Sequence, residues 1–137
     1  LHVKIAPWTW PSVDELEEYF TPVELDKMIA ENIIEICPLA YMRGRTFKNS
    51  YIIGDEFQNC TQEQVKMCLT RLGENSQMVI TGDLKQSDRG FHDNGLKDFM
   101  QRIKKSKSRR IKFVEFDRGD VERHPVVAEV LGIYGDE

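Results

Sequence analysis

The fold is decided by residues Tyr51–Asn59, which read YIIGDEFQN. Their first half is an apolar run of the length of a buried strand, and it is followed by two adjacent carboxylates, Asp55 and Glu56. In parallel sheets, ligands bind at the carboxyl ends of strands. One carboxylate there can hold Mg²⁺ through water while its neighbour orients or deprotonates an attacking water. The simpler interpretation is a strand that ends in a solvated acidic turn.

A second polar strand end follows at Thr81–Gln86, TGDLKQ, behind the predicted strand Met78–Thr81. A Gln at the end of this segment can sense a γ-phosphate or position water, because its amide both donates and accepts hydrogen bonds. Taken alone, the segment also fits an ordinary polar turn. Because one predicted helix separates the two strands, we expect both polar ends to lie close together on one edge of a parallel sheet, as a nucleotide site requires.

Cationic side chains that could contact phosphate occur in three segments. Arg43-Gly44-Arg45-Thr46 suits bidentate phosphate contact, and a surface loop held by ordinary ion pairs is the alternative. Arg123 precedes the last predicted helix, where a guanidinium near a γ-phosphate would stabilise transition-state charge. Its neighbour His124 is more typical of a structural or capping residue. The run Arg102–Arg110, RIKKSKSRR, could bind phosphate backbones, and a solvated helix end is the alternative.

The rest of the chain reads as strands that alternate with capped helices. Capping boxes predict helix starts at Ser12, Thr21 and Thr61, and Gly73 is placed to cap the end of the third helix. Alternating strands and helices predict an α/β fold with a mainly parallel sheet and helices on both faces. The other predicted elements are strands over Ile33–Cys37 and Ile111–Phe116, and helices over Asn94–Lys104 and from His124 or Pro125 to Leu131.

Size and composition are those of one globular domain or part of one. The chain has 137 residues, of which 40% are hydrophobic and 31% charged, and its net charge of −4 argues against coating nucleic acid or membrane by charge alone. No apolar run is long enough to span a membrane, and the first residues, LHVKIAPWTWP, lack the features of a secretory signal. The three cysteines have no metal-ligand spacing and predict reduced thiols in a cytoplasmic protein.

One expected part of a nucleotide site does not occur in this sequence. A strand end that carries Asp and Glu in this way is typical of P-loop NTPases, which also need a glycine-rich G-x-x-x-x-G-K-[ST] loop around the phosphates. The 137 residues contain no such loop. We therefore expect the chain to carry one half of a nucleotide site.

Four blocks taken together resemble the PhoH-like ATPase family. They are IEICPLAYMRGRT at 34–46, DEFQN at 55–59, TGDLKQ at 81–86 and RHPVV at 123–127. The order and spacing of the blocks fit the family from about Pro11 onward, and the residues within the blocks are similar to those of phage-encoded members.

This resemblance implies a RecA-like P-loop NTPase three-layer fold with a mainly parallel sheet. It implies a single partial domain over 1–137 that is incomplete at its amino-terminal side. It also implies nucleotide binding, with ATP and Mg²⁺ as cofactors, ATP hydrolysis and a link to RNA metabolism. For the complete protein, the resemblance also implies a ring-shaped homo-oligomer. It implies a cytoplasmic protein that does not associate with a membrane, in the host cytoplasm if it is phage-encoded.

The resemblance also implies roles for particular residues. Asp55 and Glu56 match the Walker B pair, in which the first residue is associated with the metal and the second activates water. Gln86 matches the γ-phosphate sensor. Gln58, in the same acidic block, is implied to lie at the cofactor site and to arrange water or couple to nucleic acid. Contacts with nucleotide are implied for Thr81 and Asp83, and contacts with phosphate or a neighbouring subunit for Arg45 and Arg123.

Three departures from the family pattern affect these expectations. Phe57 stands where a small Ala is usual, and Gly54 replaces an aliphatic residue, which could loosen the strand end. The Walker A strand, which would lie in the middle of the sheet, is absent, so we expect open strand edges there and little or no ATPase activity from the chain alone. A non-catalytic nucleic-acid-binding module and a structural subunit are the alternatives.

Overall fold

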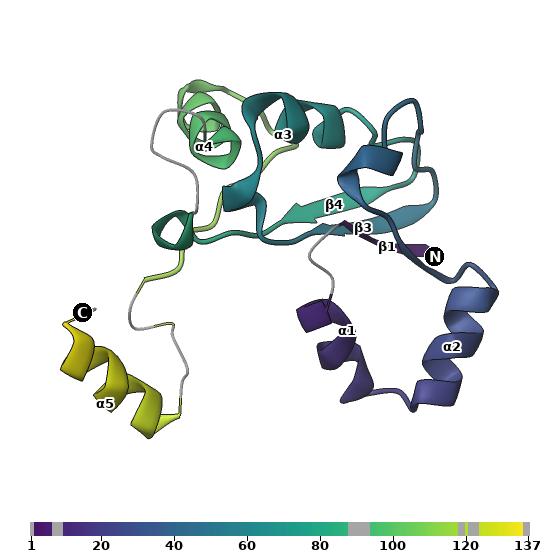
Figure 1. The fold of residues 1–137 in the computed structure, drawn as a ribbon. Helices are drawn as coiled ribbons and strands as arrows, with labels where there is room; N and C mark the ends of the chain where they lie inside the picture. Colours follow the sequence, from purple (N-terminus) through teal and green to yellow (C-terminus); the bar gives the residue numbers. More distant parts are fainter. Residues whose placement is uncertain (1, 7–9, 88–93, 118–119, 121–123, 136–137) are drawn as a thin grey trace. The chain divides into compact units, whose positions relative to one another are not determined.

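The computed structural model describes residues 2–6, 10–87, 94–117, 120 and 124–135 of the chain (Figure 1). The chain forms two compact units, Leu1–Ser106 and Lys107–Glu137. The first unit holds the sheet and the second holds the carboxyl-terminal helix. That residues 1–137 belong to one partial domain stays a prediction.

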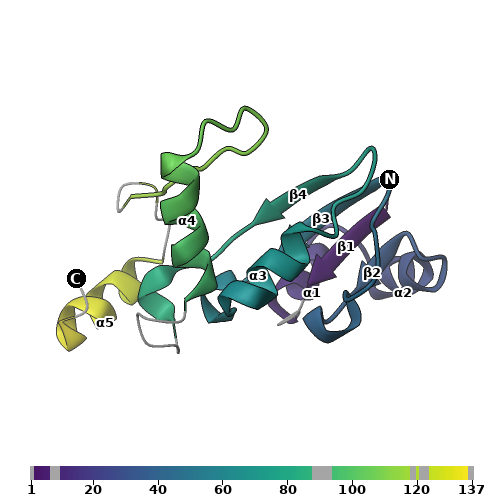
Figure 2. The same ribbon diagram turned by 90° about the horizontal axis from the view of Figure 1, so that it is seen from above.

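The first unit is built on a four-stranded sheet in which neighbouring strands are parallel, in the order β2-β1-β3-β4 (Figure 2). The strands are β1 (His2–Ala6), β2 (Ile34–Ile36), β3 (Ser50–Gly54) and β4 (Gln77–Ile80). The last three confirm the strands predicted at these places, and the sheet confirms the α/β class. The expected open edges in the middle of the sheet are wrong for the described strands, because the unpredicted β1 pairs with β2 on one side and β3 on the other.

Helices lie on both sides of this sheet. Figure 1 shows α3 and α4 on one side and α1 and α2 on the other. The helices of this unit are α1 (Trp10–Glu17), α2 (Pro22–Ala30), α3 (Gln62–Leu69) and α4 (Gly95–Lys105), and short 3-10 turns lie at η1 (Leu39–Tyr41), η2 (Phe57–Asn59) and η3 (Leu84–Gln86).

Capping boxes fix the starts of α2 and α3. The Thr21 hydroxyl accepts a hydrogen bond from the Glu24 N–H (3.4 Å), and the Glu24 carboxylate accepts one from the Thr21 N–H (2.9 Å). Thr61 and Gln64 repeat this reciprocal pair at 3.2 and 2.9 Å. Two of the three predicted capping boxes, those at Thr21 and Thr61, are confirmed.

Two other predicted helix boundaries are wrong. Ser12 lies inside α1 rather than at its cap, since Pro11 stands in the first turn, where proline is favoured. The helix α3 ends at Leu69, so Gly73 does not cap it. The Gly73 N–H instead donates to the carbonyl of Phe47 (2.8 Å), in a bridge between the segments that precede β3 and β4.

The main core joins β3 to α3 and α4. Its largest fully buried apolar side chains are those of Phe57, Met42 and Ile52. The helix α4 contributes Leu96 to the same cluster. The loops that follow β2 and β3 are therefore anchored in the core by Met42 and Phe57, which limits the freedom of the polar residues beside them.

All three cysteines are thiols within this core. Burial and, to a smaller extent, the nearby thiols of Cys60 and Cys37 together raise the pKa of Cys68 to about 12. We expect Cys68 in the folded chain to resist alkylation by iodoacetamide at pH 8 and to react once urea unfolds the chain, which mass spectrometry would detect. Equal labelling rates in both states would contradict this burial.

The same shift predicts how stability depends on pH. Because the pKa of Cys68 is higher in the folded chain than its ordinary value of 9.0, the folded state binds more protons between pH 9.0 and about 12. The contribution of this thiol to stability is therefore complete below pH 9.0 and is lost as the pH rises toward 12.

The second unit contains α5 (Pro125–Tyr134), which confirms the predicted final helix and extends it beyond Leu131. His124 is its N-cap, since the ring nitrogen Nδ1 accepts a hydrogen bond from the N–H of Val126 (3.3 Å). Of the helices in the described part of the chain, none combines the length and the apolar character needed to cross a bilayer.

The predicted strand Ile111–Phe116 is wrong, because these residues form no strand. The alternation of apolar residues breaks where Phe113 and Val114 stand side by side. The side chains of Val114 and Phe116 are 71% and 79% exposed, so neither lies on a buried face. An extended segment becomes a strand only when a neighbouring strand accepts its backbone hydrogen bonds.

Candidate functional site

The polar ends of β3 and β4 are joined directly to each other. Oδ1 of Asp55 accepts hydrogen bonds from the Thr81 hydroxyl and from the N–H of Glu56 (3.0 Å). The backbone continues this pairing, since the Thr81 N–H donates to the Gly54 carbonyl (2.8 Å) and the Phe57 N–H donates to the Thr81 carbonyl (3.1 Å). The prediction that both strand ends lie together on one edge of the sheet is confirmed.

Glu56 is held in a backbone conformation that residues with side chains seldom adopt. Its φ of 54° and ψ of 34° lie in the left-handed region. Such a residue costs roughly 1–3 kcal/mol and persists where its surroundings enforce it. The next residue, Phe57, is 0% exposed and supplies that anchor. The buried Phe57 thus fixes the backbone next to Glu56, and with it the orientation of the half-buried Glu56 side chain.

Gln58 is the buried polar centre of this edge. Its side-chain Nε2 donates to Oε2 of Glu56, and its Oε1 accepts a hydrogen bond from the N–H of Asp83 (3.1 Å). Its carbonyl accepts hydrogen bonds from Nδ2 of Asn94 (2.9 Å) and from the hydroxyl of Ser87 (3.0 Å). The Gln58 side chain therefore lies between the two strand ends.

The turn after β4 is organised by Asp83. Its Oδ1 accepts a hydrogen bond from the Lys85 N–H (2.9 Å), and its Oδ2 accepts one from Nε2 of Gln86 (3.0 Å). The residues Asp83 and Gln86 are both exposed. The Gln86 amide is therefore accessible from solvent while Asp83 fixes its orientation.

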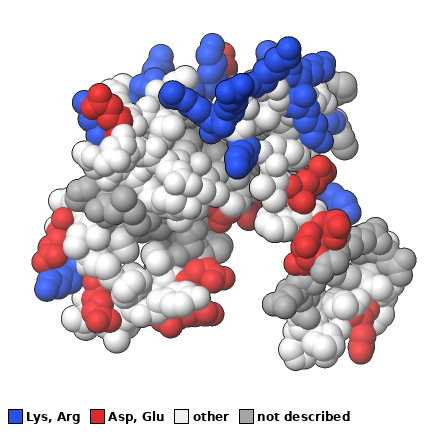
Figure 3. Space-filling model, turned by 180° about the vertical axis from the view of Figure 1, so that it is seen from behind, with Lys and Arg blue, Asp and Glu red and all other residues white. Residues whose placement is uncertain are grey.

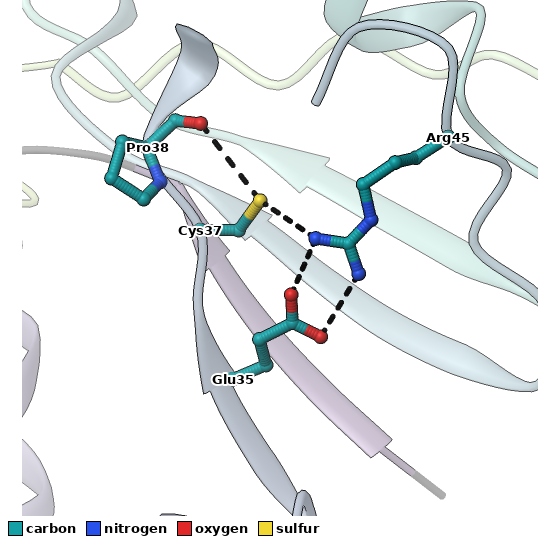
Figure 4. A network of polar contacts seen from close by, with 4 residues as sticks. All are labelled: Glu35, Cys37, Pro38 and Arg45. Carbon is teal, nitrogen blue, oxygen red and sulfur yellow. Dashed lines mark hydrogen bonds and ion pairs between the residues drawn. The ribbon is translucent and has the colours of Figure 1, made fainter. Parts of the chain in front are cut away.

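Arg45 is engaged within the fold at the end of β2 (Figure 4). Its Nη1 and Nη2 donate to the two carboxylate oxygens of Glu35 at 2.5 and 3.1 Å, and Nη1 also donates to Sγ of Cys37 (3.3 Å). The guanidinium lies over the ring of Phe47, 4.8 Å from its centre. Hydrogen bonding to Glu35 raises the pKa of Arg45. These contacts hold the Arg45 guanidinium on Glu35 of β2 and on Cys37 just after it, and β1 lies between β2 and β3 in the sheet.

Some residues escaped prediction and one predicted residue cannot be placed. Arg123 lies outside the described residues. Asn94 and Ser87 were not predicted to support Gln58. Asn is a favoured N-cap residue, so the sequence could have indicated Asn94 at the start of a helix. In the structure Asn94 is the N-cap of α4, and its Oδ1 accepts a hydrogen bond from the Lys97 N–H (3.0 Å). No pattern in the sequence marks Ser87.

Gly54 and Phe57 fit each other in space. A Cβ atom on Gly54 would lie 2.7 Å from Cε2 of Phe57 and 2.6 Å from Cδ1 of Ile80, closer than real Cβ contacts. The Phe57 ring thus occupies space that an aliphatic residue at 54 would take. Gly54 and Phe57, which are predicted to be two separate departures from the pattern of the family that the chain resembles, therefore share one volume in the structure.

This exchange predicts non-additive effects on stability. Gly54→Val is expected to cost about 1–3 kcal/mol by overpacking, and Phe57→Ala about 3–5 kcal/mol by opening a cavity. The double variant should lose less than the sum, by roughly 0.5–3 kcal/mol, because each change relieves the other. Urea unfolding of the four proteins measures this coupling, and strictly additive losses would contradict it.

Comparison with known proteins adds independent information. A sequence profile described as PhoH-like protein matches residues 1–135. The chain is 42% identical over 136 residues to a PhoH-like protein of Bacillus subtilis (strain 168) and 38% identical over 135 residues to Protein PhoH of Escherichia coli (strain K12). These alignments cover 98% and 96% of the chain but 42% and 37% of the relatives. The chain therefore spans less than half the length of the curated relatives it matches.

Proposed function

The chain belongs to the PhoH-like protein family, and on this basis we propose that it forms the carboxyl-terminal portion of an ATP-hydrolysing protein with a RecA-like P-loop fold. The observation that supports this function best is the joined pair of strand ends. It brings Asp55, Glu56 and the turn that carries Gln86 to one edge of a parallel sheet, where such folds bind nucleotide.

The groups around Asp55 fit Mg²⁺. This ion prefers oxygen ligands and is usually bound by one or two carboxylates together with water and phosphate. Asp55 supplies a carboxylate for this role. Thr81 would orient it by donating to Oδ1, and Oδ2 would be available as a ligand for the ion. When bound, Mg²⁺ would neutralise charge that develops on the phosphates.

The neighbouring side chains fit the remaining tasks in hydrolysis. Glu56 would orient the attacking water and accept its proton. Gln86 would donate from its exposed amide to the γ-phosphate, in an orientation set by Asp83. Arg123, and Arg45 after it exchanges Glu35 for phosphate, would contact phosphate or a neighbouring subunit of a ring.

Phosphate release from ATP tests this function. The 137-residue chain would be compared with the longest polypeptide that its open reading frame encodes. Magnesium-dependent turnover is expected where a GKT loop is present, and little or none from the chain alone, because backbone amides and a Lys on the phosphates supply most of the affinity. Appreciable turnover by the short chain would show that its site is complete. No turnover by a longer polypeptide that contains the loop would contradict the proposed function.

A second function, RNA binding, is supported by the distribution of charge. Figure 3 shows Lys and Arg gathered on the side of the first unit that carries α3 and α4, and Asp and Glu on the side that carries α1 and α2. Arg102, Lys104 and Lys105 of α4 are exposed. The basic run continues in the sequence as far as Arg110. We propose that the complete protein couples hydrolysis to work on RNA in the cytoplasm.

Salt-dependent binding to single-stranded RNA tests this second function. Neutralising the basic run is expected to weaken binding and to reduce the slope of log K against log salt by about 0.7 for each phosphate contact that is lost. The residues to replace by Gln are Lys104, Lys105, Lys107, Arg109 and Arg110. Lys27→Gln on α2 is the control and should leave the slope unchanged. Unaltered binding after the five replacements would remove the electrostatic basis for this function.

A further inference from the structure

We infer that Gln58 is a positioning residue that fixes the Glu56 carboxylate relative to the turn Asp83–Gln86. The inference rests on the proposed ATP-hydrolysing function. It replaces the general role that the family resemblance implies for Gln58 by a specific one, in which Gln58 acts on the Glu56 carboxylate and does not contact nucleotide or nucleic acid. Gln58 acts through its two hydrogen-bonded partners and does not touch the reacting atoms.

The burial of Gln58 excludes direct contact with a ligand. The residue is 1% exposed, and both ends of its amide already have partners within the protein. In the described part of the chain, no buried side-chain nitrogen or oxygen lacks a hydrogen-bond partner. Because an unpaired buried amide is costly, these bonds would be kept throughout a reaction cycle.

The surroundings of Gln58 hold it from both sides. Its carbonyl is fixed by Asn94 at the start of α4 and by Ser87. On the other side, a Cβ at Gly82 would lie 2.8 Å from Oε1 of Gln58 and 2.6 Å from Cδ2 of Leu96. Gly82 therefore permits the close approach that brings the Asp83 N–H to Oε1.

The hydrogen bonds form a continuous line from the exposed sensor to the water-activating group. Gln86 donates to Asp83, the Asp83 N–H donates to Gln58, and Gln58 donates to Glu56. A Gln at position 58 can accept from a backbone N–H with one end and donate to a carboxylate with the other. Leu can do neither, and an ionised Glu can do only the first. Through these hydrogen bonds, binding of a phosphate by Gln86 would affect the position of the Glu56 carboxylate.

A first experiment tests this coupling without nucleotide. In ¹H–¹⁵N spectra of the 137-residue chain, Glu56→Ala is expected to shift the Gln58 side-chain amide signals and the Asp83 backbone signal. It should also speed exchange of the Gln58 amide protons about tenfold or more, since one charge-assisted hydrogen bond is lost. The control Glu63→Ala, an exposed carboxylate at the start of α3, should move neither. Unchanged Gln58 and Asp83 signals in Glu56→Ala would overturn the inference.

A second experiment uses ATP turnover by the longest polypeptide of the reading frame. Gln58→Leu and Gln58→Glu are both expected to lower kcat about tenfold to hundredfold while KM for ATP stays within about twofold. A raised KM with normal kcat would make Gln58 a nucleotide contact. Normal kcat in Gln58→Glu, which keeps the bond to Asp83, would reduce Gln58 to a structural support. Either result overturns the inference. No turnover by an unsubstituted polypeptide that contains the GKT loop would contradict the proposed function alone, and the spectra would then decide the role of Gln58.

Discussion

Alanine at position 95 is expected to lower the free energy of unfolding by about 3 kcal/mol, the upper end of the range for overpacking. Gly95 is the first residue of α4, and its N–H donates to the carbonyl of Cys60 (2.8 Å). A Cβ there would lie 2.3 Å from the carbonyl oxygen of Thr61 and 2.7 Å from the nitrogen of Gln62. These are backbone atoms at the capped start of α3, so they cannot rotate away as a side chain would.

Urea unfolding followed by circular dichroism measures this loss. Gly132→Ala is the matched control, because Gly132 is also helical. Apart from its chain neighbours and the nearby backbone of its own helix, no described atom lies within 4 Å of the position that a Cβ would take there. That change should be neutral or stabilising by up to about 1 kcal/mol, since Gly is unfavourable inside a helix. If both variants were equally stable, α4 could not pack on α3 as closely as described.

Replacing Glu56 by Gln is expected to lower kcat for ATP hydrolysis about 10²–10⁴-fold and to leave ATP affinity nearly unchanged. The amide keeps the shape of the side chain and an oxygen that can accept from Gln58, but it cannot take a proton from water. The loss should therefore appear in kcat, because this interaction is made in the transition state.

Turnover and equilibrium ATP binding, both measured on the longest polypeptide of the reading frame, separate these effects. Glu63→Gln is the control, since Glu63 is exposed at the start of α3 and is expected to leave both quantities unchanged. Wild-type turnover in Glu56→Gln would mean that another group activates water.

Local signals predicted much of the fold and of the site. The capping boxes at Thr21 and Thr61 bring their own hydrogen-bond partners within the next turn, so three or four neighbouring residues suffice to identify them. The strand before Asp55 was recognisable as an apolar run that ends in two carboxylates. Its closeness to Thr81 followed from the rule that one helix joins neighbouring parallel strands.

The features that escaped prediction depend on residues far apart in the sequence. The strand β1 is as long as β3, so its length did not hide it; its place in the sheet is defined by its pairing with β2 and β3. The segment 111–116 has strand-like residues, but it forms no strand in the described part of the chain. The ion pair of Arg45 with Glu35 depends on how the loop after β2 folds back. The contact of Gln58 with Asn94 depends on the position of α4, which no local pattern contains.

Paramagnetic broadening by Mn²⁺ is the most direct test of whether the edge formed by β3 and β4 holds a magnesium nucleotide. Mn²⁺, which accepts the same oxygen ligands as Mg²⁺, would be added with an equal amount of ATP to the longest polypeptide of the reading frame. A site at Asp55 predicts that the amide signals of Asp55, Glu56 and Thr81 broaden first and recover when excess Mg²⁺ is added. Broadening confined to the acidic helices α1 and α2, with these three signals unaffected, would contradict it.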